Sequence, residues 1–144
     1  MTLTLLLVHA AATLLMTGVI WVVQLVHYPA FRWIDPARTA DFQAFHMRRI
    51  TWIVGPAMTL ELGTGLALLA YAPAAVPPAM PWSGAGLLVL IWGMTGLVHV
   101  PQHARLTDGF DAATHRALVR SNWIRTLAWT LRAALAGWMC AVAL

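Results

Sequence analysis

Apolar residues fill four long blocks of the chain, and polar residues gather between the blocks. Two blocks carry no formal charge, and the other two carry one and two charged residues. Roughly 20 helical residues span the ~30 Å hydrocarbon core of a bilayer, so each block has about the length of a transmembrane helix. We therefore predict a single all-α integral membrane domain over residues 1–144, with four transmembrane helices in an antiparallel bundle. The blocks are Leu3–Val26, Ile50–Tyr71, Gly84–Val100 and Trp123–Leu144.

The composition supports a membrane protein. Hydrophobic residues make up 60% of the 144 positions, and charged residues make up only 10%, against about a quarter in soluble domains. The alternative is a soluble four-helix bundle. Such a bundle needs polar outer faces on its helices, and these segments lack them.

The positions of the arginines predict the orientation in the membrane. Four arginines lie between the first and second blocks and three lie between the third and fourth, whereas the connection at 72–83 has four prolines and no charge. Because positively charged loops stay in the cytoplasm, we expect a multi-pass protein of a bacterial-type inner membrane with both termini on the non-cytoplasmic side. The net charge of +4 then reflects the orientation of the protein in the membrane. It does not indicate a nucleic-acid-binding surface, so we expect no nucleic-acid partner.

A short motif occurs twice, as LVHYP at 25–29 and as LVHVP at 97–101. Each copy closes one helix and is followed by an arginine-bearing loop. The repetition predicts a tandem duplication with units 1–72 and 73–144, related by a pseudo-two-fold axis along the membrane normal. It would bring His27 and His99 to one depth, and each proline would kink or end its helix. The alternative is that these histidines only mark the membrane interface.

Each predicted helix carries one polar or aromatic stripe. His9 and His27 are five helical turns apart and share a face, as do Trp92, Thr95 and His99 on the third helix. Polar atoms that face lipid stay without hydrogen-bond partners, so we expect the stripes to face each other inside the bundle.

Glu61 and Arg132 lie close to the middles of their helices, where a lone arginine is costly. We therefore expect them to pair inside the bundle, either as a structural ion pair or as part of a ligand site. Arg125, on the same helical face as Arg132, has no obvious carboxylate partner. A guanidinium suits bidentate contact with an anionic ligand group.

The histidines suggest two kinds of cofactor. His99 and His103 have the i, i+4 spacing that can place two imidazoles on one divalent metal ion, although Pro101 disturbs that spacing. Haem b needs one or two axial histidines and an apolar slot, which His27 with His99, or His9 alone, could provide. The alternative is that all of these histidines are structural.

Residues of the second half carry a family resemblance. VPQHARL at 100–106 followed by SNWIRT at 121–126 resembles the C-terminal half of the anthrone-oxygenase-like family of small four-helix membrane proteins. The matching residues are Val100, Pro101, Arg105, Leu106, Trp123, Ile124, Arg125 and Thr126.

The first half more weakly resembles the HemJ-type protoporphyrinogen oxidases. His9 stands where that family has a histidine proposed to serve haem, and FHMRRITWIVGPAM at 45–58 resembles its entry into the second helix. The family's Asn-Glu-x-Pro reads Asn122-Trp-Ile-Arg125 here. Both resemblances imply membrane oxidoreductases that act on polycyclic, partly apolar substrates.

These observations favour an integral membrane oxidoreductase or oxygenase that binds an apolar ring substrate in the cytoplasmic half of the bundle. Arg125 and Asn122 would hold polar groups of the substrate, His99 would serve as cofactor ligand or proton acceptor, and Glu61 with Arg132 would complete the catalytic set. Two alternatives stay open: a small-solute or proton carrier, which with only four helices would need to be a homo-oligomer, and a non-catalytic membrane assembly subunit.

Overall fold

The computed structural model describes residues 2–144, and within this range the chain is helical and contains no strand. Four helical segments are long and apolar enough to cross a membrane, as the sequence predicts. They have 29 to 33 residues each, so at 1.5 Å per residue they exceed the ~30 Å hydrocarbon core. Their ends therefore reach the headgroup region. The segments are Thr2–Trp33, Thr39–Tyr71, Ala79–Thr107 and Ala112–Ala143.

Two of the four segments change their helical type along the way. The first comprises α1 (Thr2–Val22), the π-helical turn η1 (Val23–His27), α2 (Tyr28–Ala30) and the 3-10 turn η2 (Phe31–Trp33). The third comprises α4 (Ala79–Gly93), the π-helical turn η4 (Met94–His99) and α5 (Val100–Thr107). The second and fourth are the single helices α3 (Thr39–Tyr71), which the 3-10 turn η3 (Pro36–Arg38) precedes, and α6 (Ala112–Ala143).

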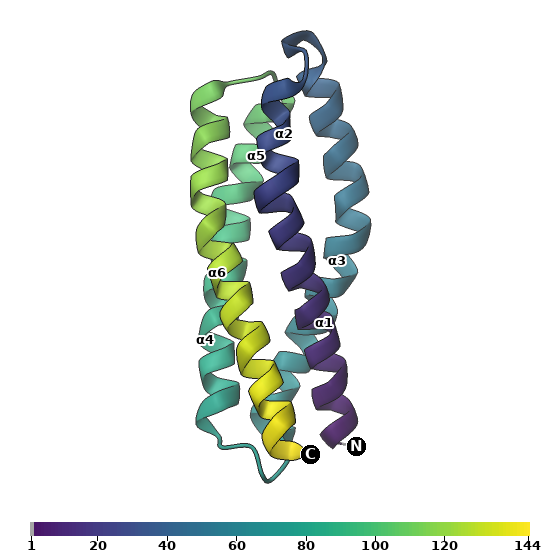
Figure 1. Ribbon diagram of the computed structural model, residues 1–144, viewed down its shortest axis with the longest axis vertical. Helices are drawn as coiled ribbons and strands as arrows, with labels where there is room; N and C mark the ends of the chain where they lie inside the picture. The colour runs from purple at the N-terminus through teal and green to yellow at the C-terminus, as the bar shows by residue number, and fades with distance from the viewer. Residues whose placement is uncertain (1) are drawn as a thin grey trace.

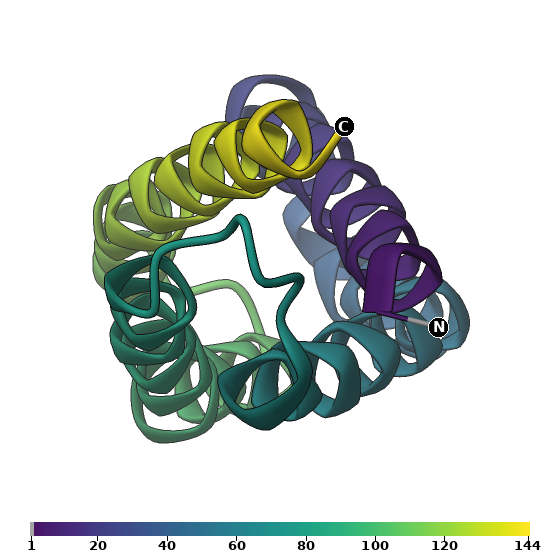
Figure 2. The ribbon, with the colours of Figure 1, turned by 90° about the horizontal axis from the view of Figure 1, so that it is seen from below.

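The segments stand side by side around a common centre. The two ends of the chain lie at one end of the molecule with the connection between α3 and α4, and the other two connections lie at the opposite end (Figure 1). Seen along the long axis, the segments occupy four corners (Figure 2). Both α1 and α4 pack against α3 and α6, so each polar stripe can reach the centre.

The outer surface is strongly apolar. Leu97 is 82% exposed and Val89 is 75% exposed, and they belong to a large set of exposed leucine, valine and tryptophan side chains. In water this surface would be unfavourable, whereas lipid tails match it. The exposed apolar surface and the four long helices indicate a multi-pass membrane protein.

Inside, three apolar layers alternate with two polar layers. Leu6, Leu68 and Met139 mark the layer nearest the termini. Met16, Met58, Ile91 and Trp129 mark the middle layer. Val23, Tyr28, Phe31, Leu106 and Leu118 form the layer nearest the arginine-bearing connections. The buried polar side chains lie between these layers.

Each LVHxP motif coincides with a π-helical turn. The amide of Tyr28 donates to the carbonyl of Val23, and the amide of Val100 donates to that of Thr95, five residues back in both cases. A proline follows at the next position, where an ordinary turn would press its ring against the carbonyl four residues back. The wider turn accommodates the ring, so the helix continues through Pro29 and Pro101 where the sequence led us to expect a kink or an end.

Aspartates cap helical segments at the arginine-bearing end. Asp111 Oδ2 accepts from the backbone amide of Thr114 over 2.6 Å, so Asp111 caps the N-terminus of α6. Asp35 Oδ1 accepts from the amide of Ala37 over 2.9 Å. Asp35 therefore caps the turn η3 rather than α3, which begins at Thr39.

Candidate functional site

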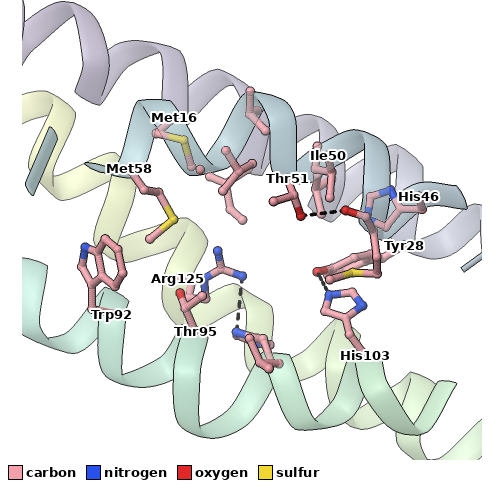
Figure 3. A pocket seen from close by; sticks show the side chains of 18 of the residues that line it. Met16, Tyr28, His46, Ile50, Thr51, Met58, Trp92, Thr95, His103 and Arg125 are labelled. Atoms are coloured by element: carbon pink, nitrogen blue, oxygen red, sulfur yellow. Dashed lines mark hydrogen bonds between the residues drawn. The ribbon is translucent and has the colours of Figure 1, made fainter. Parts of the chain in front are cut away.

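A cavity of about 270 Å³ lies between the middle apolar layer and the layer at the arginine-bearing end. This volume lies near the lower end of the range for small-molecule sites. One wall is apolar and includes Met16, Ile20, Val54 and Met58. The facing wall, here called the polar wall, carries Thr95, His99, His103 and Arg125, with the guanidinium of Arg125 pointing into the space (Figure 3). The polar lining residues are Tyr28, His46, Thr51, Thr59, Thr95, His99, His103 and Arg125.

Arg125 and His99 form the centre of the polar wall. Arg125 Nη1 donates to Nδ1 of His99 over 3.3 Å and to Oδ1 of Asn122 over 3.2 Å. Since a guanidinium has only donors, Nδ1 of His99 carries no proton. The single ring proton is then on Nε2, which donates to the hydroxyl of Ser121 over 3.0 Å.

Further hydrogen bonds hold these two side chains in place. Asn122 Nδ2 donates to Oε1 of Gln24 over 2.8 Å, and the amide nitrogen of Gln24 donates to the carbonyl of Val119. On the other side, Ser121 donates to Gln102 over 3.3 Å. A buried network with this many satisfied members is rigid, so Arg125 and His99 are fixed before any ligand arrives.

The charge of Arg125 has no counter-ion. The residue is only 7% exposed, and none of the described residues that line the cavity is Asp or Glu. Its Nε is buried without a hydrogen-bond partner in the described part of the chain. A buried cation with an unused donor beside a cavity favours a ligand with a negative or carbonyl oxygen.

His103 belongs to a second group on the same wall. Gln43 Nε2 donates to Nδ1 of His103 over 2.7 Å, and His103 Nε2 lies 2.9 Å from the hydroxyl of Tyr28. With Nδ1 accepting, Nε2 carries the proton and donates to the phenolic oxygen. The hydroxyl of Tyr28, which Figure 3 shows beside His103, can then donate its hydrogen to a ligand in the cavity.

His46 and His27 form a stacked pair with ring centroids 3.9 Å apart. His46 lines the cavity, and both rings line an outer groove between α1 and α3. His27 does not line the cavity that His99 lines. Its Nε2 is buried without a partner among the described residues.

Glu61 and Arg132 form the ion pair that the sequence predicts, with Nη2 of Arg132 donating to Oε1 of Glu61. Arg132 Nη1 also donates to the carbonyl of Gly84. His9 is the third member, since its Nδ1 lies 3.0 Å from the hydroxyl of Thr64 and its Nε2 lies 4.0 Å from Oε1 of Glu61. This cluster lies on the terminal side of the middle apolar layer.

The five residues that we expected to form one catalytic set lie in two separate places in the structure. His99, Arg125 and Asn122 come together, whereas Glu61 and Arg132 form a separate cluster with His9 and do not line the cavity. The face shared by Trp92, Thr95 and His99 does line the cavity, as the helical spacing predicts. His103 is only 7% exposed and lines the same cavity.

The contacts of the histidines bear on cofactor binding. Both ring nitrogens of His99 and both of His103 have hydrogen-bond partners, so none is free to ligate iron or another metal as placed. A haem macrocycle also exceeds the cavity in size. Among residues 2–144, no three His, Cys, Asp or Glu side chains gather in a way that would hold a metal ion. The mechanism proposed below uses neither haem nor a metal ion.

Four residues of the site were not singled out from the sequence: Tyr28, Gln43, His46 and Ser121. Tyr28 lies inside LVHYP, so the repeated motif already marked its position. Gln43 and His46 precede the second apolar block with i, i+3 spacing, which places them on one helical face. Ser121 is adjacent to Asn122, and no pattern in the sequence marked it as a site residue.

A scan against protein-family models, a search of curated proteins and a search of solved structures found no match to this chain. The function proposed below rests on the residues and on their geometry.

Proposed function

We propose that the protein is a membrane oxidoreductase or oxygenase that binds an apolar ring substrate in the cavity beside Arg125. The observation that carries this proposal is the buried Arg125, which faces an otherwise apolar cavity with no carboxylate among the described lining residues. The apolar wall suits a flat ring system, and Arg125 and Tyr28 offer donors to one oxygen of that ring. Asn122 holds the guanidinium in place.

The polar wall suits a reaction in which negative charge develops on a substrate oxygen. Loss of a proton from a ring carbon next to or conjugated with a carbonyl gives an enolate, which Arg125 would stabilise as fixed donors do in oxyanion holes. Nδ1 of His99 carries no proton and accepts a hydrogen bond from Arg125; it would accept the substrate proton once a substrate oxygen replaces it as the acceptor of that Arg125 N–H. With dioxygen as oxidant, a ring CH2 group and O2 become a ring carbonyl and water.

The cluster of Glu61, Arg132 and His9 has a different role in this proposal. It lies apart from the cavity, and its members mainly bind one another. We infer that it joins α1, α3, α4 and α6 in one register, which leaves the chemistry to the side with Arg125.

We infer the placement in the membrane from the arginines. The four segments form an antiparallel bundle across a bacterial-type inner membrane, with the arginine-bearing connections and the cavity toward the cytoplasm and both termini on the other side. The π-helical turn before each LVHxP motif supports a tandem duplication of units 1–72 and 73–144. An oligomer of identical chains remains compatible with the exposed apolar surface.

The alternative of a carrier or proton channel finds less support. A relay needs polar groups through the whole bundle, but the middle layer between the two polar clusters consists of Met16, Ile20, Met58, Ile91 and Trp129, with alanines. A non-catalytic assembly subunit would leave the unpaired Arg125 and its cavity without a use.

Oxygen consumption by the purified protein tests the proposal, with anthrone as substrate. Anthrone carries a ring carbonyl opposite a ring CH2, and 9,10-dihydroanthracene is a matched ring without the carbonyl. We expect turnover of anthrone above its spontaneous oxidation, none of dihydroanthracene, and a loss of roughly 100-fold or more in kcat/KM in Arg125→Gln. Arg38→Gln, an exposed arginine outside the cavity, is the control. Equal rates for wild type and Arg125→Gln would refute the proposal.

A further inference from the structure

A second cavity, of about 310 Å³, opens at the arginine-bearing end of the molecule. It lies between the end of the first segment and the start of α6, away from the cavity beside Arg125. Three of its six lining residues are arginines, and none of these described residues is acidic. The lining residues are Pro29, Arg32, His115, Arg116, Val119 and Arg120.

The three arginines come from two segments. Arg32 belongs to η2, and Arg116 and Arg120 are one turn apart on α6. All ion pairs within residues 2–144 involve Glu61, so none of the three guanidinium groups is in a salt bridge, and Asp111 is the one carboxylate near enough to Arg116 for the two charges to interact. All three side chains are exposed and can therefore reach an anion from outside.

His115 shapes the inner wall of this cavity. It is buried, and its Nε2 donates to the backbone carbonyl of Tyr28 over 2.8 Å. This hydrogen bond fixes the chain just before Pro29. Pro29 and Val119 provide an apolar surface beside the arginines.

We propose that an anionic phospholipid binds at this cavity, with its apolar part inside the cavity and its phosphate held by the guanidinium groups of the three arginines at the rim. Arginines suit phosphate because their planar groups donate two parallel hydrogen bonds. The helices end here at headgroup level, where basic pockets between transmembrane helices meet anionic lipids. Pro29 and Val119 would contact the apolar part of the lipid next to its phosphate. This inference does not depend on the proposed oxidoreductase activity.

Native mass spectrometry of the detergent-solubilised full chain tests this inference, with phosphatidylglycerol and phosphatidylcholine as probes. We expect wild type to retain phosphatidylglycerol in preference to phosphatidylcholine. The triple variant Arg32→Gln/Arg116→Gln/Arg120→Gln should lose that preference. The matched control Arg38→Gln/Arg48→Gln/Arg49→Gln removes the same charge from the same end of the molecule, outside this cavity, and should keep it.

Three results would overturn the proposal. Equal losses in the two triple variants would mean that only the general surface charge attracts lipid. Equal retention of both lipids by wild type would remove the requirement for an anionic headgroup. If millimolar inorganic phosphate displaces phosphatidylglycerol and raises the melting temperature as much as the lipid does, the ligand is a free anion.

Single variants keep the test decisive if the triple variant does not fold. Each basic residue near an anionic membrane surface strengthens binding about fivefold. We therefore expect Arg116→Gln and Arg120→Gln each to weaken phosphatidylglycerol binding by about that factor. Arg38→Gln should leave it unchanged, and an equal effect of all three would again refute the assignment.

Discussion

Arg125 donates from Nη1 to Nδ1 of His99 across the cavity wall, over 3.3 Å. Because Arg125 can only donate, this contact sets the ring proton of His99 on Nε2 and leaves the nitrogen nearest the cation unprotonated. A substrate oxygen that takes over this hydrogen bond from Arg125 would free the lone pair of Nδ1 as a proton acceptor beside a positive charge. This relationship between the two residues is the basis of the first prediction.

His99→Ala should abolish anthrone oxidation while the protein still folds. The substitution removes the proposed proton acceptor, and general-base catalysis typically contributes about 10²–10⁴-fold. Initial rates of oxygen uptake and a thermal melt in detergent check the two parts of this prediction. Leu97→Ala, on the lipid-exposed face of the same turn, is the control. Full activity in His99→Ala would favour a purely structural role for the histidine.

Glu61→Gln should lower the melting temperature of the protein in detergent. The change removes the charge that compensates the buried Arg132, and loss of one partner of a buried ion pair typically costs about 3–5 kcal/mol in soluble proteins. The double variant Glu61→Gln/Arg132→Gln should recover part of this loss because no charge is left unpaired. If the single variant melts like wild type, the ion pair contributes nothing to stability.

Labelling of single cysteines should place Ala74 and Asp108 on opposite sides of the membrane. Both positions are exposed, and they lie in connections at opposite ends of the molecule (Figure 1). In a Cys140→Ala background, a membrane-impermeant maleimide added to intact cells should label Ala74→Cys, and Asp108→Cys only after lysis. Labelling of Asp108→Cys alone in intact cells would reverse the proposed orientation.

The cap of α6 should make stability depend on acid pH. Hydrogen bonds from the side chain and the backbone amide of Thr114 lower the pKa of Asp111 below its ordinary value of 3.8. A lowered pKa in the folded state gives stability that is present above the unfolded-state pKa and is lost as pH falls through the folded-state pKa.

Thermal melts of wild type and Asp111→Asn at several pH values check this dependence. Asparagine keeps the capping geometry but removes the charge. We expect wild type to melt higher near pH 6, with the difference shrinking below about pH 4 as Asp111 becomes protonated. A difference that stays constant down to pH 3 would contradict a role for the charge.

Several features of this protein follow from its sequence alone. Four apolar blocks of membrane-spanning length require helices, because in lipid only internal hydrogen bonds can satisfy the backbone. The pairing of Glu61 with Arg132 follows from the cost of leaving either charge unpaired at that depth. The cap at Asp111 and the face shared by Trp92, Thr95 and His99 follow from local rules of helical geometry.

Only the tertiary structure decided how the polar residues divide into two clusters. Stripe patterns show which face of a helix is polar, but the depth at which stripes meet depends on helix packing and on π-helical turns that shift the register. His27 stacks on His46 and does not line the cavity that His99 lines, a placement that the repeated motif does not predict. Arg125 lacks a carboxylate partner because Glu61 lies on the other side of the middle layer, where it pairs with Arg132. A residue's partner is set by where two helices cross, and no local pattern in the sequence contains that information.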